Sequence, residues 1–151
     1  MLNVGDKAPD FNLMSDEGEE VHLRDFAGKN VILYFYPKDD TPGCTKEACS
    51  FRDENDAFAR RRAVILGVSL DDVQSHQSFK EKYGLPFTLL SDPDAAVSKA
   101  YDAYKQKNMY GRKFWGIERT TFIIGPDGRV KAVFPKVRVD GHHEEVLAAL
   151  T

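Results

Sequence analysis

The chain has 151 residues, of which 42% are hydrophobic and 30% are charged, with two cysteines and a net charge of −3. These values predict one ordinary globular domain over residues 1–151 and argue against nucleic acid or an anionic membrane as a partner. No signal peptide and no apolar run of about 20 residues is visible. A cytoplasmic, reducing location is therefore expected for the two cysteines.

Hydrophobic periodicity and turn residues predict strands and helices that alternate along the chain, which is typical of an α/β fold. Short runs of β-branched and aromatic residues indicate strands, and apolar residues at helical spacing indicate helices. The expected strands are 11–14, 20–23, 31–36, 63–70, 87–92, 120–124 and 129–134. The expected helices are 23–26, 41–61, 71–83, 93–104 and 141–150, and residues 106–117 are expected to form a loop.

The stretch from Pro37 to Asp53 holds both cysteines and directly follows the most apolar run in the chain. Thr41 fits an N-cap and Pro42 fits the first helical position, so Cys44 is expected in the first turn of a helix. Free N–H groups and the helix dipole stabilise an anion there, and a thiol with an ordinary pKa of ~8.5 becomes partly ionised. The alternative is a small buried apolar residue, but the Thr-Pro-Gly turn favours an exposed, reactive thiol.

The second cysteine, Cys49, lies five residues after Cys44. In a continuous α-helix their Cα atoms are about 8.6 Å apart, whereas a disulfide needs roughly 7 Å or less. The two thiols can therefore pair only if the first helical turns unwind. Cys49 is either a resolving thiol that is mobilised by oxidation or a core residue on the buried face of the helix, and both can hold.

These residues carry a family resemblance. Pro37-x-x-x-Thr41-x-x-Cys44 resembles the peroxiredoxin active-site signature, and the longer string Thr41–Asp53 is similar to the peroxiredoxin Q subfamily, also called bacterioferritin comigratory protein. The resemblance continues through Gly116–Phe122 and closes at Gly141-His142. It implies a thioredoxin-like fold, with a central mixed β-sheet flanked by helices and an N-terminal β-hairpin extension.

The resemblance also implies that Pro37, Thr41, Cys44 and Arg119 build one pocket. Thr41 can offer its hydroxyl to the sulfur or to a peroxide, Pro37 shields the thiolate from water, and Arg119 stabilises it and polarises the O–O bond. Without the motif, Arg119 reads as a surface charge at the start of a strand. Glu47 opposes thiolate formation by its charge, and it is expected to bind Arg119 or the helix N-terminus.

The resemblance implies a thiol peroxidase that reduces hydrogen peroxide and organic hydroperoxides. Cys44 is the peroxidatic cysteine, and Cys49 resolves its sulfenic acid as an intramolecular disulfide that thioredoxin reduces. No metal, flavin or haem cofactor is needed, because sulfur is the redox centre. The subfamily leans toward a monomer.

The residues alone are also compatible with two other functions. One is a protein disulfide reductase, although Cys-x-x-Cys is missing, and the other is a redox sensor or holdase that exposes apolar surface. The four histidines lack zinc-ligand spacing with the cysteines, and His142 and His143 are interpreted as a helix cap and a surface residue. Phe114 and Trp115 are expected to be partly exposed packing residues or part of a partner surface.

Overall fold

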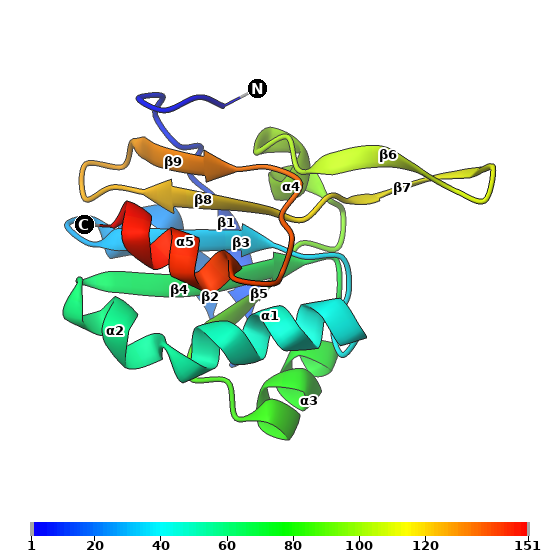
Figure 1. Ribbon diagram of the computed structural model, residues 1–151, viewed down its shortest axis with the longest axis horizontal. Coiled ribbons are helices and arrows are strands. Elements are labelled where there is room, and N and C mark those ends of the chain that lie inside the picture. The colour runs from blue at the N-terminus through cyan, green and yellow to red at the C-terminus, as the bar shows by residue number, and fades with distance from the viewer. Residues whose placement is uncertain (1, 151) are drawn as a thin grey trace.

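We describe the fold from a computed structural model covering residues 2–150; residues 1 and 151, the ends of the expected domain, lie outside the described residues. Seven strands form one mixed sheet in the order β2-β1-β5-β4-β3-β8-β9, and two more form a separate ribbon (Figure 1). The main-sheet strands are β1 Asn12–Ser15, β2 Glu20–His22, β3 Asn30–Phe35, β4 Ala63–Ser69, β5 Thr88–Ser91, β8 Thr120–Ile124 and β9 Val130–Phe134. The ribbon strands are β6 Tyr104–Met109 and β7 Arg112–Ile117.

Helices flank this sheet, as expected for a thioredoxin-like α/β fold. They are η1 Leu23–Phe26, α1 Pro42–Asp53, α2 Asn55–Arg60, α3 Val73–Tyr83, α4 Ala96–Ala100 and α5 His142–Ala149. In Figure 1, α1, α2 and α5 lie together over one face of the sheet. None of the helices within residues 2–150 has both the length and the apolar character needed to cross a bilayer.

The central strand β3 is buried on both sides, which explains its continuous apolar sequence. Val31, Leu33 and Phe35 point into one hydrophobic cluster. Ile32 and Tyr34 point into the other, together with residues of α1, α2, α3 and α5. Because successive strand residues face opposite sides of a sheet, this one strand supports both cores.

Strand pairing brings three functional segments to one edge of the sheet. Strand β3 runs parallel to β4, with Phe35 opposite Val68, and antiparallel to β8, with Phe35 opposite Thr120. The ends of β3 and β4 therefore lie beside the start of β8. This edge is where the Cys44 helix begins.

Two expected helices differ from the structure. The helix expected over 41–61 is two helices, because the chain bends at Glu54, whose φ and ψ are −104° and 10°. The helix expected over 93–104 shrinks to α4, because Ala95 and Asp102 adopt left-handed φ values of 61° and 57°. Such backbone conformations interrupt a right-handed helix at both ends.

The loop expected over 106–117 is wrong, because these residues belong to the β6–β7 hairpin. Its two-residue turn, Tyr110-Gly111, has φ values of 53° and 79°, the positive values that suit a tight hairpin turn. The tip projects well beyond the main sheet in Figure 1. The expectation of partial exposure is confirmed for Phe114 and Trp115, whose side chains are 40% and 59% exposed.

The interpretation of His142 as a helix cap is also wrong. Gly141 occupies the N-cap position of α5, and no side chain caps this helix. The His142 ring is buried, with Nε2 2.7 Å from the Thr121 hydroxyl and Nδ1 2.6 Å from a Glu145 carboxylate oxygen. It therefore ties α5 to strand β8.

Candidate active site

Cys44 lies in the first turn of α1, directly after the turn that follows β3. Because intrahelical hydrogen bonds begin with the Thr45 amide, which donates to the Thr41 carbonyl oxygen at 2.8 Å, the amides of Gly43 and Cys44 have no acceptor within the helix. The expectation of an exposed thiol is wrong, because Cys44 is only 2% exposed. The helical position is confirmed, and Cys44 is buried as part of the hydrophobic cluster that also holds Tyr34 and Ala48.

Arg119 covers the sulfur. It lies between β7 and β8, and its Nη2 donates to Cys44 Sγ at 3.3 Å. The absence of a side chain at Gly43 leaves room for this approach, because a Cβ atom there would make a tight contact of 3.2 Å with the same Nη2. Arg119 is therefore part of the thiol site, and the alternative of a plain surface charge is excluded by this contact.

Glu47 anchors the other side of the guanidinium. Arg119 Nη1 donates to Glu47 Oε1 at 2.7 Å, and both side chains are largely buried. Burial raises the pKa of Glu47 to about 7, although the charge and hydrogen bond of Arg119 act in the opposite direction. The guanidinium is thus held between a carboxyl group and a sulfur atom, and Glu47 binds Arg119 as one of its two expected roles.

Thr41 takes the N-cap position of α1, with extended backbone angles of −99° and 156°, but its side chain does not cap the helix. Its hydroxyl donates instead to the Lys38 carbonyl oxygen at 2.8 Å. That bond uses the hydroxyl proton and leaves the oxygen lone pairs free to accept a hydrogen bond. Pro37 lies at the start of the same turn and is partly buried.

Cys49 lies on the same continuous helix, and both thiols are free. It is partly exposed, whereas Cys44 is buried. The interpretation of Cys49 as a buried core residue is therefore only partly met. With α1 intact from Pro42 to Asp53, the two sulfur atoms belong to positions that helix geometry keeps apart.

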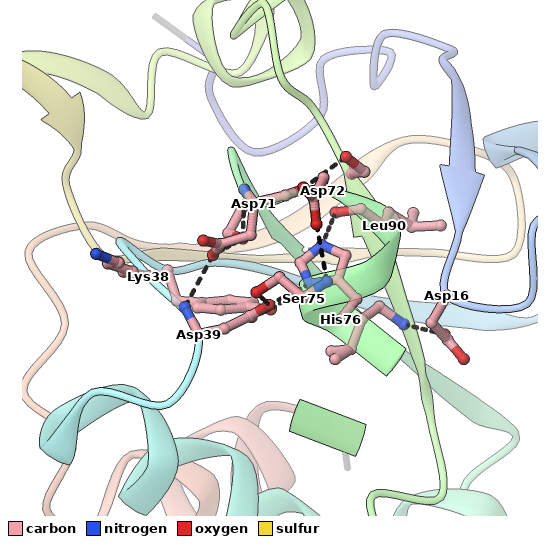
Figure 2. Close-up of polar contacts among 12 residues, drawn as sticks. Asp16, Lys38, Asp39, Asp71, Asp72, Ser75, His76 and Leu90 are labelled. Atoms are coloured by element: carbon pink, nitrogen blue, oxygen red, sulfur yellow. Dashed lines mark hydrogen bonds and ion pairs between the residues drawn. The ribbon is translucent and has the colours of Figure 1, made fainter. Parts of the chain in front are cut away.

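A buried histidine behind the Pro37–Thr41 turn was missed by the sequence reasoning. Figure 2 shows His76 of α3 beside Asp39, Ser75 and Leu90. His76 Nδ1 lies 2.7 Å from an Asp39 carboxylate oxygen, and Nε2 lies 2.9 Å from the Leu90 carbonyl oxygen. Both neighbours are acceptors, so the geometry favours donation by both ring nitrogens, as in an imidazolium ion.

The surroundings of His76 agree with a charged ring. Burial alone lowers the pKa of His76, but the hydrogen bond and charge of Asp39 outweigh it, and the pKa is raised above its usual 6.5. Asp39 also accepts from the Tyr36 hydroxyl at 2.5 Å and from the Ser75 hydroxyl at 2.8 Å. Its backbone amide donates to the Asp71 carboxylate at 2.8 Å (Figure 2). The turn before Cys44 is therefore hydrogen-bonded to Asp71 and to α3.

The same cluster is the one place in residues 2–150 with the donor set for a metal ion. Asp39, Asp71 and His76 each offer a ligand atom within 4.8 Å of the others. However, both His76 nitrogens and both Asp39 carboxylate oxygens already make hydrogen bonds. A metal would have to break these bonds, so the arrangement fits an ion pair better than a coordination site.

Sequence and structure comparisons place this chain in a known family. The model of the AhpC/TSA family matches residues 4–133, and the chain belongs to this family. A Coxiella burnetii protein that is named as a peroxiredoxin Bcp is 58% identical to this chain, over 99% of both chains. Peroxiredoxin Bcp of Bacillus subtilis is 49% identical over 99% of this chain and 95% of its own length.

A solved structure shows the same fold. The bacterioferritin comigratory protein of Xanthomonas campestris, studied for its alkyl peroxide reduction activity, superimposes with a TM-score of 0.91. It is 45% identical and covers 99% of this chain and 96% of its own. The peroxiredoxin resemblance and the thioredoxin-like fold are therefore confirmed, and the protein is a thiol peroxidase by class.

Proposed function

We propose that this peroxiredoxin reduces hydroperoxides with Cys44 as the attacking thiol. The observation that carries the proposal is the Arg119 guanidinium 3.3 Å from Cys44 Sγ, at the N-terminus of α1. A fixed cation and the positive end of a helix both stabilise a thiolate. The same guanidinium can stabilise the negative charge that develops on a peroxide oxygen.

The first step transfers one oxygen atom. The Cys44 thiolate attacks the terminal peroxide oxygen, an S–O bond forms and the O–O bond breaks. The leaving oxygen takes up a proton and departs as water or an alcohol, while Cys44 becomes a sulfenic acid. Sulfur loses two electrons and the peroxide gains them, so the step needs no metal, flavin or haem.

Cys49 completes the cycle in this proposal. Its thiol condenses with the Cys44 sulfenic acid, which releases water and forms the Cys44–Cys49 disulfide. Because an intact helix holds their Cα atoms about 8.6 Å apart, the first turns of α1 must unwind before the bond closes. A thioredoxin-type dithiol then reduces the disulfide and is itself oxidised.

The other site residues act on these groups. The Thr41 hydroxyl oxygen can accept a hydrogen bond from the peroxide, because its own proton is donated to the Lys38 carbonyl oxygen. Pro37 shields the site from water at the start of the turn. Glu47 orients Arg119 through the 2.7 Å hydrogen bond.

The substrate range, location and assembly are part of the same proposal. The Xanthomonas campestris relative is described by alkyl peroxide reduction, which supports organic hydroperoxides beside hydrogen peroxide as substrates. We place the protein in the cytoplasm as a monomeric single domain over residues 1–151. Sedimentation of the reduced and oxidised forms, and fractionation of the producing cell, test these two points.

The experiment that tests the mechanism compares two serine variants. Cys44→Ser is expected to lose peroxide turnover, whereas Cys49→Ser should still form the sulfenic acid but lose recycling by thioredoxin. Mass spectrometry after one equivalent of peroxide should show loss of two hydrogens and a crosslinked Cys44–Cys49 peptide. Unchanged peroxidase rates in Cys44→Ser would end the proposal.

A further inference from the structure

The β6–β7 hairpin has a composition unlike the rest of the chain. It carries four cations and no acidic residue, in a protein whose net charge is −3. The cations are Lys105, Lys107, Arg112 and Lys113. Exposed aromatic residues, methionine and arginine together are characteristic of protein interfaces.

The hairpin also gathers most of the exposed apolar surface. Among residues 2–150, six large hydrophobic side chains are exposed, and four of them lie here. Those four are Met109, Tyr110, Phe114 and Trp115, with exposed fractions of 58%, 102%, 40% and 59%. Clustered exposed apolar side chains mark an interaction site more often than chance exposure.

The strand register divides these side chains between two faces. Opposed residues of an antiparallel pair share a face, and β6 and β7 pair Lys107 with Phe114 and Met109 with Arg112. These four residues form one face, which we call the thiol-side face. The intervening Lys113 and Trp115 lie on the other face, where Trp115 stacks on Tyr104 at 5.8 Å between ring centroids.

The thiol-side face begins close to Cys44, at the base of the hairpin. Strand β7 ends at Ile117, two residues before Arg119, and the Glu118 amide donates to the Ala103 carbonyl oxygen at 2.8 Å at the base of the hairpin. Burial lowers the pKa of Lys107, and the charge of Arg119 lowers it further, while that of Cys44 acts in the opposite direction. Lys107 therefore lies within electrostatic range of the thiol site.

We propose that the thiol-side face of the hairpin, formed by Lys107, Met109, Arg112 and Phe114, docks the dithiol reductant. The partner is a thioredoxin-type protein that carries acidic side chains beside an apolar surface. Its dithiol has to reach the Cys44–Cys49 disulfide, and this face is both cationic and apolar and has Lys107 within electrostatic range of Cys44. The proposal rests on the proposed peroxidase cycle and adds the surface that recognises the reductant.

The test separates reduction from oxidation. The reductant kcat/KM is measured with a bacterial thioredoxin, its reductase and NADPH, and oxidation of Cys44 by hydrogen peroxide is measured separately in single turnover. Arg112→Glu and Phe114→Ala are expected to lower the reductant kcat/KM about ten-fold. Both should leave the rate of Cys44 oxidation within two-fold of the unchanged protein.

Lys113→Glu is the matched control, because it reverses a neighbouring exposed charge on the opposite face. It should stay within two-fold in both assays, and Arg112→Glu should flatten the salt dependence of the reductant step. An equal loss in Lys113→Glu, or no loss in Arg112→Glu and Phe114→Ala, overturns the assignment of this face.

Other outcomes also decide the matter. Slower oxidation of Cys44 by peroxide in Arg112→Glu would show that the face serves the peroxide substrate. Binding of anionic vesicles, or self-association through this face, would show that it serves a membrane or a second copy of the chain. Each of these results overturns the proposal. If thioredoxin fails to reduce the unchanged protein, docking is refuted while the peroxide step stands. If Cys44 fails to react with peroxide, the proposed function itself fails.

Discussion

Replacing His76 by asparagine removes the buried positive charge behind the Pro37–Thr41 turn. The side chains of His76 and Asp39 are 0% and 3% exposed. Removal of one partner from a buried ion pair costs about 3–5 kcal/mol, because the remaining charge stays buried without compensation. Asparagine keeps a donor toward Asp39 but loses the second bond to Leu90, so a loss at the lower end, about 3 kcal/mol, is expected near pH 6.

The loss should depend on pH in one direction. The pKa of His76 is raised in the folded protein above its usual 6.5. The stabilisation from the imidazolium ion is therefore complete below pH 6.5 and disappears as the pH rises through the folded pKa. Tyr36 and Asp71 also face this group, and burial holds the pKa of Tyr36 well above 10, so its hydroxyl does not ionise in this window.

The assay is urea unfolding of the reduced protein, followed by circular dichroism at pH 6 and pH 9. The difference between the unchanged protein and His76→Asn should be large at pH 6 and clearly smaller at pH 9. His22→Asn, a partly exposed histidine, is the control and should change the unfolding free energy by less than about 0.5 kcal/mol. An equal loss at both pH values would refute the imidazolium assignment.

Three further predictions concern the site helix and the strands beneath it. The pKa of Glu47 is about 7 in the folded protein, against an ordinary value of 4.5. Because the folded state holds this proton more tightly, the free energy of unfolding of the unchanged protein should fall by about 3 kcal/mol, relative to that of Glu47→Gln, as the pH rises from 4.5 to about 7. Parallel curves of stability against pH would contradict this. Phe51→Ala removes a fully buried ring 5.0 Å from Tyr34 and should cost about 3–5 kcal/mol in urea unfolding, whereas a loss below 1 kcal/mol would show that α1 contributes little to the core. Gly67→Ala places a Cβ 2.9 Å from both Leu89 and Tyr34 and should cost about 1–3 kcal/mol by overpacking, with an unchanged melting temperature as the contrary result.

The anchoring of the turn before Cys44 also bears on the catalytic cycle. Asp39 is bound to His76 and Asp71, and Asp40 accepts from Lys82 and from the Tyr83 hydroxyl, both at 2.8 Å. If α1 unwinds on oxidation, this turn can stay fixed on α3 while the helix opens.

The sequence alone was sufficient for features that depend on neighbouring residues. The apolar run 31–36 predicted the central strand, because it is short, rich in β-branched and aromatic residues and ends at a proline, which fits a strand buried on both faces. Thr41 and Pro42 predicted where α1 begins, because helix starts have strong local preferences. The short signature around Cys44 indicated the family for the same reason, since its chemistry is concentrated in one turn.

Other features depend on residues that only the tertiary structure brings together. Cys44 contacts Arg119, which is 75 residues away, and the charge on His76 depends on Asp39 and on the Leu90 carbonyl group. The β6–β7 hairpin escaped prediction because both of its faces are largely polar or exposed, so hydrophobic alternation was absent. Neighbouring residues therefore determined where the helix that carries Cys44 begins. Long-range packing decided what surrounds the Cys44 thiol, because contacts between segments that are distant in the chain leave no periodic signal in the sequence.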